Sequence, residues 1–121
     1  MSKVRRIVEE ESARDFLRRH AAKKAAEHVE VDLDNAYSMS DLAGTNFVYF
    51  DVGGQGDKWF MSAVTDCPNM SEIMIEDDGP YRSRDTAVEA GMRAAYDWFS
   101  NNDLRSYPDG RLRMFMRRNR L

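Results

Sequence analysis

The sequence predicts an α+β fold, in which a single domain spanning 1–121 carries an antiparallel sheet of three to five strands and two helices. Runs of β-branched and aromatic residues alternate with short turns rich in Gly and Pro, which is typical of antiparallel strand pairs. One later stretch keeps helical spacing throughout. No long crossover separates the strands, so the predicted order is α-β-β-β-α-β-β. A chain of 121 residues with 42 % hydrophobic content has the size of one domain.

The first predicted helix covers residues 8–28, and residues 30–44 are predicted to form an acidic loop. Helical spacing joins a set of small, apolar and polar residues on one face: Ala13, Phe16, Leu17, His20, Ala21 and Lys24. Phe16 and Leu17 are the only large apolar residues on this face, so we expect the helix to pack through a small patch or against a partner. Within the loop we expect a short helical turn near residues 40–42.

Three strands are predicted next, over residues 46–52, 58–65 and 71–77. The turn sequence GGQGD joins the first two, DCPN follows the second, and DGP follows the third. Alternation along the second strand places two sets on opposite faces, Trp59, Met61 and Ala63 against Phe60, Ser62 and Val64. Core packing is the expected role of the aromatic set Phe47, Tyr49, Trp59 and Phe60, because the flanking residues are acidic and would repel the phosphates of stacked nucleotides.

The clearest element is a helix over residues 84–99. Ser83 is a suitable N-cap, and Asp85 lies in the first turn, where the helix dipole favours an anion. Gly91 and Ala95 are small enough to allow close approach to a sheet.

A final hairpin is predicted through Pro-Asp-Gly, with strands at 104–107 and 111–116. Strand alternation would place Leu112, Met114 and Met116 on one face, and Arg111, Arg113 and Phe115 on the other. The basic tail would then be mainly a structural edge strand. We expect residues 1–7 and 117–121 to be disordered ends.

Charge is unevenly distributed along the chain, whose formal net charge is −3. Residues 1–29 carry eight basic and five acidic side chains, residues 30–90 carry three and 13, and residues 91–121 carry seven and three. An acidic centre of net −10 therefore lies between two basic flanks. Such charge asymmetry affects which partners the protein attracts and how fast they associate, whereas it says little about the fold. Mutual neutralisation, with Arg113, Arg117 and Arg118 folding back toward acidic groups, is one interpretation, and a bipolar surface is the other.

Motifs for catalysis or metal binding do not emerge from the sequence. His20 and His28 are eight residues apart, or about 12 Å along a helix, so one helix cannot bring both to one metal. Cys67 has no nearby histidine and is interpreted as a small packed residue. The segment beginning Asp32-x-Asp34 departs from a calcium loop at its fifth, sixth and twelfth positions. GGQG precedes a strand where a phosphate-binding loop needs a helix. The sequence thus predicts no enzyme, no cofactor and no metal site.

The acidic centre is the predicted functional surface. We expect it to dock on a basic surface of another protein, one that binds nucleic acid. The candidate contact residues are Asp32, Asp34, Asp51, Asp57, Glu76, Asp77 and Asp78, with Tyr37 and Tyr81 as aromatic anchors. Carboxylates at strand ends could also bind Mg²⁺, but we prefer to interpret these acidic residues as solvent-exposed surface charges.

Direct binding of nucleic acid is the alternative function. It would use the arginines of the C-terminal segment, Arg111, Arg113, Arg117, Arg118 and Arg120. We favour the protein partner, because strand alternation gives the first half of this segment a structural role.

The element order α-β-β-β-α resembles the double-stranded-RNA-binding domain. That family places a lysine cluster at the start of its second helix, where this chain has SRDTAVEAG with Asp85 and Glu89. We therefore do not expect RNA binding by that mode.

Small size, the lack of a catalytic motif and the acidic centre also resemble the cofactor-free α+β proteins of phages and mobile elements, including anti-CRISPR proteins. The resemblance implies a stoichiometric inhibitor that binds a host protein and presents carboxylates where nucleic acid would lie. A lone cysteine and no visible export signal favour the cytoplasm. No apolar run is long enough to predict a membrane span.

Overall fold

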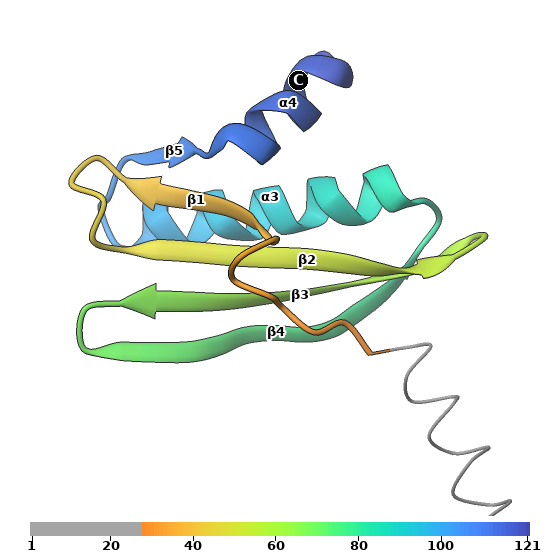
Figure 1. The fold of residues 1–121 in the computed structure, drawn as a ribbon, viewed down its shortest axis with the longest axis horizontal. Coiled ribbons are helices and arrows are strands. Elements are labelled where there is room, and N and C mark those ends of the chain that lie inside the picture. Colours follow the sequence, from red (N-terminus) through yellow and green to blue (C-terminus); the bar gives the residue numbers. More distant parts are fainter. Residues whose placement is uncertain (1–27) are drawn as a thin grey trace, which may run out of the picture.

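The computed structural model describes residues 28–121. It contains β1 (Tyr37–Asp41), β2 (Phe47–Gln55), β3 (Lys58–Cys67), β4 (Met70–Tyr81), α3 (Arg84–Asn101), β5 (Ser106–Pro108) and α4 (Gly110–Arg118) (Figure 1). The helix predicted over 8–28 lies outside the described residues except for His28, which begins an extended segment. The α+β class is confirmed.

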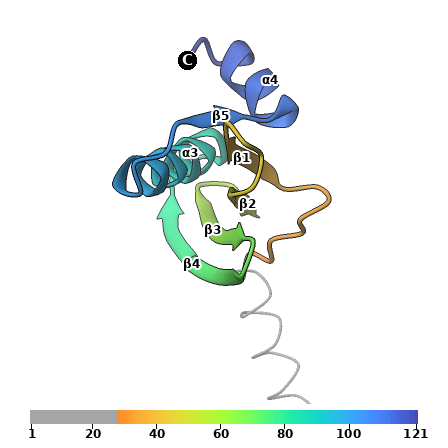
Figure 2. The same cartoon turned by 90° about the vertical axis from the view of Figure 1, so that its left-hand side faces the viewer.

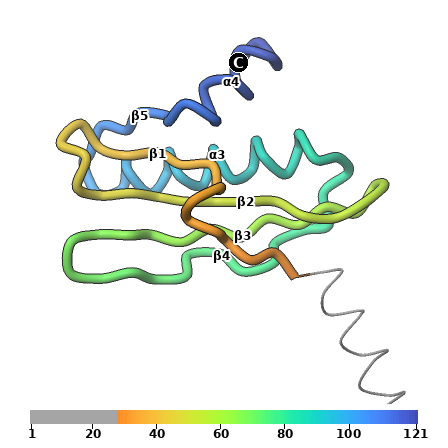
Figure 3. Tube along the Cα trace, in the orientation of Figure 1, coloured from red at the N-terminus to blue at the C-terminus, as the bar shows by residue number. Residues whose placement is uncertain are grey.

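The five strands form one antiparallel sheet in the order β4-β3-β2-β1-β5. β4 is one outer strand, and β5 is the other, with α4 beyond it (Figure 1). The sheet curves around α3, which lies on its concave side (Figure 2). Residues 28–36, here called the strap, run across the opposite, convex side of the sheet before entering β1 (Figure 3).

The core lies between α3 and the concave face of the sheet. Alternation along β2 and β3 delivers the buried side chains Val48, Phe50, Met61 and Ala63 to this face. α3 contributes Val88, Ala95 and Phe99, each fully buried, as its helical spacing predicted.

α3 begins and packs as the sequence predicted. The Ser83 hydroxyl accepts a hydrogen bond from the Thr86 amide at 3.1 Å, which satisfies one of the free N–H groups of the first turn. Gly91 is required by close approach, because a Cβ atom there would lie 2.2 Å from Cδ2 of the Phe50 ring. The helix continues to Asn101, where the Asn102 amide group binds the Trp98 carbonyl.

The prediction of a loop over residues 30–44 is wrong in its second half, where β1 forms. β1 pairs with both β2 and β5, and Tyr37 and Met39 enter the core. Its last residue, Asp41, is 7 % exposed, and its carboxylate accepts hydrogen bonds from the amide and side chain of both Thr45 and Asn46. These bonds close the β1–β2 turn where a helical turn was expected.

The predicted final hairpin is wrong in its second half: the strand expected at 104–107 overlaps β5, but residues 110–118 form the helix α4. Asp109 of the Pro-Asp-Gly sequence acts as its N-cap, and its carboxylate accepts from the Gly110 amide at 2.7 Å and from the Ser38 hydroxyl at 2.6 Å. Leu112 and Phe115 are buried on one side of the helix, which replaces the alternation expected of a strand.

Residues 117–121, predicted to be a disordered end, continue from α4. The Leu121 amide donates to the Met116 carbonyl at 2.8 Å, and the Asn119 side chain donates to the Phe115 carbonyl at 2.9 Å. The last residues are thus tied to the helix by backbone and side-chain bonds.

Two of the predicted turns belong to strands. Gly53 and Gly54 extend β2, so the β2–β3 turn is reduced to Gly56 and Asp57. Asp78, Gly79 and Pro80 extend β4, with a cis peptide bond between Gly79 and Pro80.

The aromatic set is not core as expected. Phe47 and Tyr49 stack on each other with ring centroids 5.7 Å apart, and all four aromatic residues, including Trp59 and Phe60, are only half-buried. Val48 and Phe50, on the other face of β2, fill the core instead.

Candidate functional site

The outer strand β4 gathers three of the predicted contact residues, Glu76, Asp77 and Asp78, together with Glu72. Its pairing with β3 is irregular at three points, between Trp59 and Ala63 and again before Val64. At one of these, Glu76 and Asp77 together stand opposite the single β3 residue Ser62. Asp77 adopts a φ of 51°, unusual for a residue with a side chain.

Such bulges and charges affect how an outer strand can bind. Bulges and carboxylates interrupt the straight row of backbone groups that an added strand would need. Any binding at this edge would therefore involve side chains, since the addition of a partner strand is disfavoured.

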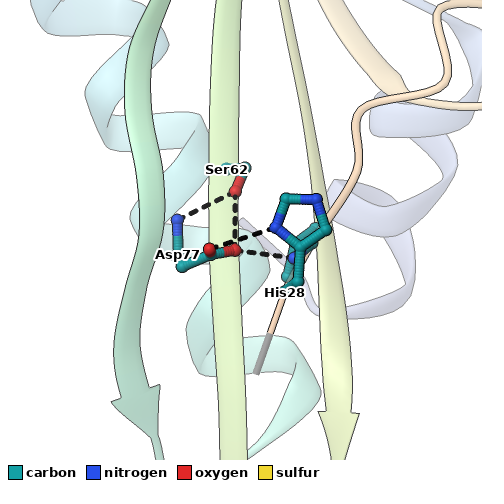
Figure 4. A network of polar contacts seen from close by, with 4 residues as sticks. His28, Ser62 and Asp77 are labelled. Atoms are coloured by element: carbon teal, nitrogen blue, oxygen red, sulfur yellow. Dashed lines mark hydrogen bonds and ion pairs between the residues drawn. The ribbon is translucent and has the colours of Figure 1, made fainter. Parts of the chain in front are cut away.

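Asp77 is the centre of a polar network that joins β4, β3 and the strap (Figure 4). One carboxylate oxygen, Oδ1, accepts from the Val29 amide at 2.6 Å and lies 3.4 Å from the Ser62 hydroxyl. The other oxygen, Oδ2, lies 3.2 Å from Nδ1 of His28. The Asp77 amide in turn donates to the Ser62 hydroxyl at 2.9 Å. These bonds hold the start of the strap on the sheet, so Asp77 has a structural role that its neighbours on β4 lack.

The network brings serine, histidine and aspartate together without forming a nucleophilic triad. In a triad the histidine receives the proton of the serine, and the aspartate orients the histidine. Here both Ser62 and His28 contact Asp77, and Ser62 is only 4 % exposed. In this arrangement the Ser62 hydroxyl has no histidine base among residues 28–121.

Beside this network lies an open, mainly apolar pocket of about 220 Å³. The strap forms one wall and β3 and β4 form the floor, with lining residues His28, Val29, Glu30, Val31, Ser62, Val64, Ile73, Ile75 and Glu76. The strap passes close over β2 here, since a Cβ atom at Gly53 would lie 3.5 Å from Val29. Ile73, on the outer strand, is 68 % exposed.

The other predicted acidic residues lie apart from β4. Asp32 and Asp34 are exposed in the turn of the strap, where hydrogen bonds from the Asn35 side chain and the Asp34 amide lower the pKa of Asp32. Asp51 is half-buried on β2, and this burial raises the pKa of its carboxyl despite Arg111 at 4.0 Å. Asp57 is exposed in the β2–β3 turn. The acidic centre of the sequence is therefore several separate groups, of which the one on β4 is the largest.

The two predicted aromatic anchors differ in exposure. Tyr37 is 3 % exposed, stacks on Phe50 with centroids 5.3 Å apart and accepts a hydrogen bond from Arg84, so it belongs to the core. Tyr81 is half-buried at the end of β4 and donates its hydroxyl hydrogen to Asp78. Burial and this hydrogen bond raise the pKa of Tyr81 to about 12. Only Tyr81 keeps a surface that a partner could contact.

Four of the five predicted basic residues lie on α4, beyond the other edge of the sheet, and Arg120 follows the helix. The Arg111 guanidinium lies over the Tyr37 ring, 4.1 Å from its centroid, and thus covers the core. The remaining four, Arg113, Arg117, Arg118 and Arg120, are exposed. Arg117 and Arg118 lie in the last turn of the helix, where the dipole favours cations.

The acidic residues of β4 and the arginines of α4 thus lie at opposite edges of one sheet. Within residues 28–121 the ion pairs are His28–Asp77 and Arg111–Asp51. Neither the carboxylates of Glu72, Glu76 and Asp78 nor the guanidinium groups of Arg113, Arg117, Arg118 and Arg120 take part in one there. The neutralisation considered from the sequence does not occur between these described groups.

Comparison of the whole chain with protein-family models, with curated proteins and with solved structures gave no match. Among the described helices, neither has the length and apolar character needed to cross a membrane.

Proposed function

We propose that this chain is a non-catalytic protein-binding module, which uses the acidic edge formed by Glu72, Glu76, Asp78 and Tyr81 to occupy a basic surface of another protein. The supporting observation is that the three carboxylates are exposed on one outer strand and have no ion-pair partner among residues 28–121. Ionised groups that do not contribute to packing remain available to a partner.

The chemistry of this edge favours a partner rich in Lys and Arg. Clustered carboxylates raise the encounter rate with a positive surface, and such a surface is what nucleic-acid-binding proteins present. Tyr81, next to Asp78, supplies the aromatic contact in which affinity commonly concentrates. The proposed role is a stoichiometric inhibitor or modulator that keeps nucleic acid off its partner.

A charge-reversal pair tests this proposal. Glu76→Lys with Asp78→Lys reverses the acidic edge and leaves Asp77 intact, because Asp77 holds the strap. Asp34→Lys with Asp57→Lys is the matched control, since both residues are exposed, lie away from β4 and give the same change in net charge. A partner captured by the wild-type chain and purified is then assayed for association rate and for displacement of its nucleic acid.

We expect the β4 pair to slow association about tenfold and the control pair to have a smaller effect. The difference between them should shrink between about 0.05 M and about 0.5 M salt, because screening shortens the reach of exposed charges. Equal binding by wild type and the β4 pair at every salt concentration would refute a role for this edge.

Direct nucleic-acid binding is the second candidate function, and the exposure of four arginines on and after α4 favours it. Gel shifts with DNA and RNA probes distinguish the two. Binding that is lost in Arg113→Ala, Arg117→Ala and Arg118→Ala, and kept in the β4 pair, would support this alternative.

A further inference from the structure

The side chains of His28, Glu76 and Asp77 converge at the junction of the strap and β4. One possible ligand atom from each lies within 4.8 Å of the other two. Consecutive residues of a regular strand point to opposite faces, yet Glu76 and Asp77 turn their oxygens to one place. The bulge opposite Ser62 and the positive φ of Asp77 account for this convergence.

We propose that His28, Glu76 and Asp77 bind a divalent transition-metal ion of the Zn²⁺ class. The closest pair, Nδ1 of His28 and Oδ2 of Asp77, is 3.2 Å apart. Tetrahedral Zn²⁺ with bonds of about 2.0–2.1 Å places neighbouring ligand atoms about 3.3 Å apart. These two atoms therefore already have the spacing of two ligands on one ion.

Hydrogen bonds to the Asp77 carboxylate fix its direction, as hydrogen-bond partners of ligating side chains do in metal sites. The Val29 amide and the Ser62 hydroxyl lie against Oδ1, and Oδ2 is turned toward His28. Hydrogen bonds to the non-coordinating atom of a ligand orient it and strengthen binding. Figure 4 shows these contacts around Asp77.

The donor types select the class of metal. An imidazole nitrogen favours Zn²⁺ and its neighbours in the first transition row, whereas Mg²⁺ and Ca²⁺ prefer oxygen ligands alone. The His28 side chain is 40 % exposed, Glu76 is exposed, and both line the open pocket beside the strap. Water can therefore complete the coordination.

The test uses the full chain treated with EDTA and then titrated with Zn²⁺ by calorimetry, with Co²⁺ absorption to report geometry. His28→Gln removes the nitrogen ligand. His20→Gln is the matched control, because these two are the only histidines in the chain. Glu76→Gln is a second test variant at an exposed position, so a change in binding can be read even if His28→Gln weakens the fold.

We expect one Zn²⁺ per chain, a loss of at least about tenfold in affinity in His28→Gln and in Glu76→Gln, and wild-type binding in His20→Gln. Zn²⁺ should also raise the thermal midpoint of the wild type, because it joins the strap to β4. Equal affinity in His28→Gln and wild type, or displacement of Zn²⁺ by an equal concentration of Mg²⁺, would overturn the site. No partner protein enters this measurement, so its outcome is independent of the binding function proposed above.

Discussion

The two edges of the sheet, β4 at one and β5 with α4 at the other, differ in what their charged residues contribute to the fold. At the α4 side, Arg111 covers the ring of Tyr37 and Asp109 caps the helix while binding Ser38. At the β4 edge, the side chains of Glu72 and Glu76 make no hydrogen bond or ion pair within the described residues, and the Asp78 carboxylate accepts a hydrogen bond from Tyr81. The basic end of the sequence therefore contributes to structure, whereas the acidic edge is the surface for which we propose a partner.

Burial follows the same division. α4 places Leu112 and Phe115 in the core at 0 % and 4 % exposure. β4 is the longest of the strands in residues 28–121, yet its apolar residues Met74 and Ile75 are only half-buried. Substitutions of the buried residues of α4 should consequently be costly, whereas substitutions of the exposed carboxylates of β4 should be well tolerated, and the predictions below test this contrast.

The largest effect is expected at Phe115. Phe115→Ala should lower the free energy of unfolding by about 3–5 kcal/mol, because it empties the space between α4 and Tyr37. Met114→Ala is the matched control on the same helix, since Met114 is 63 % exposed, and should change stability by less than about 0.5 kcal/mol. Urea unfolding measures both. A loss below about 1 kcal/mol in Phe115→Ala would mean that the packing of α4 on the core contributes little to stability.

Arg111 should give the next largest effect. Arg111→Ala removes the contact with the Tyr37 ring and the long ion pair with Asp51, at a cost of about 1 kcal/mol. Arg117→Ala, at an exposed position, should stay within about 0.5 kcal/mol. If the two variants unfold at the same urea concentration, the arginines of α4 are equivalent and none of them is structural.

This contrast also shows what the sequence could predict. α3 was placed correctly because its signals are local: the Ser83 cap, the spacing of Val88, Ala95 and Phe99, and small Gly91. The β2–β3 hairpin was found for the same reason, since alternation and glycine turns act within a few residues.

Elements decided by tertiary contacts were missed. RLRMFM alternates like a strand, yet Leu112, Phe115 and Met116 also fit helical spacing, and packing on Tyr37 decides between the two. β1 was missed because its short run ends in Asp41, and a carboxylate is not expected in a buried strand. The hydrogen bonds from Thr45 and Asn46 make its burial possible, and they form only in the folded turn.

The candidate site was predicted only in part. Glu76, Asp77 and Asp78 are neighbours in sequence, so their grouping was predictable. The separate role of Asp77 was not, because His28 is 49 residues away and no periodicity relates the two. The bulge that turns Asp77 toward the strap depends on pairing with β3, which composition does not reveal.

Unlike the exposed carboxylates of β4, the Asp41 carboxylate stabilises the fold. Hydrogen bonds from the Asn46 side chain and the Thr45 amide, in that order, lower the pKa of Asp41 to about 2. Because an unfolded Asp titrates near about 3.9, its contribution is present above pH ~4 and is lost as pH falls toward ~2. Asp41→Asn should therefore be less stable than wild type at neutral pH, with a flatter loss of stability over that acid range.

Thermal unfolding across this pH range measures the effect. Asp57→Asn, at an exposed residue of the β2–β3 turn, is the control and should follow the wild-type profile. Parallel profiles for Asp41→Asn and wild type would show that Asp41 does not stabilise the turn through its charge.

The smallest effect is expected on β4 itself. Glu72→Gln, Glu76→Gln and Asp78→Asn together remove three exposed negative charges and retain an acceptor for Tyr81. Surface changes of this kind should alter the free energy of unfolding by less than about 0.5 kcal/mol per site, and reduced repulsion between like charges should favour a small gain. Urea unfolding of the triple variant beside Arg111→Ala gives a direct comparison of the two sides. A loss above about 2 kcal/mol in the triple variant would show that these carboxylates hold the sheet together, and the case for reserving them for a partner would then fail.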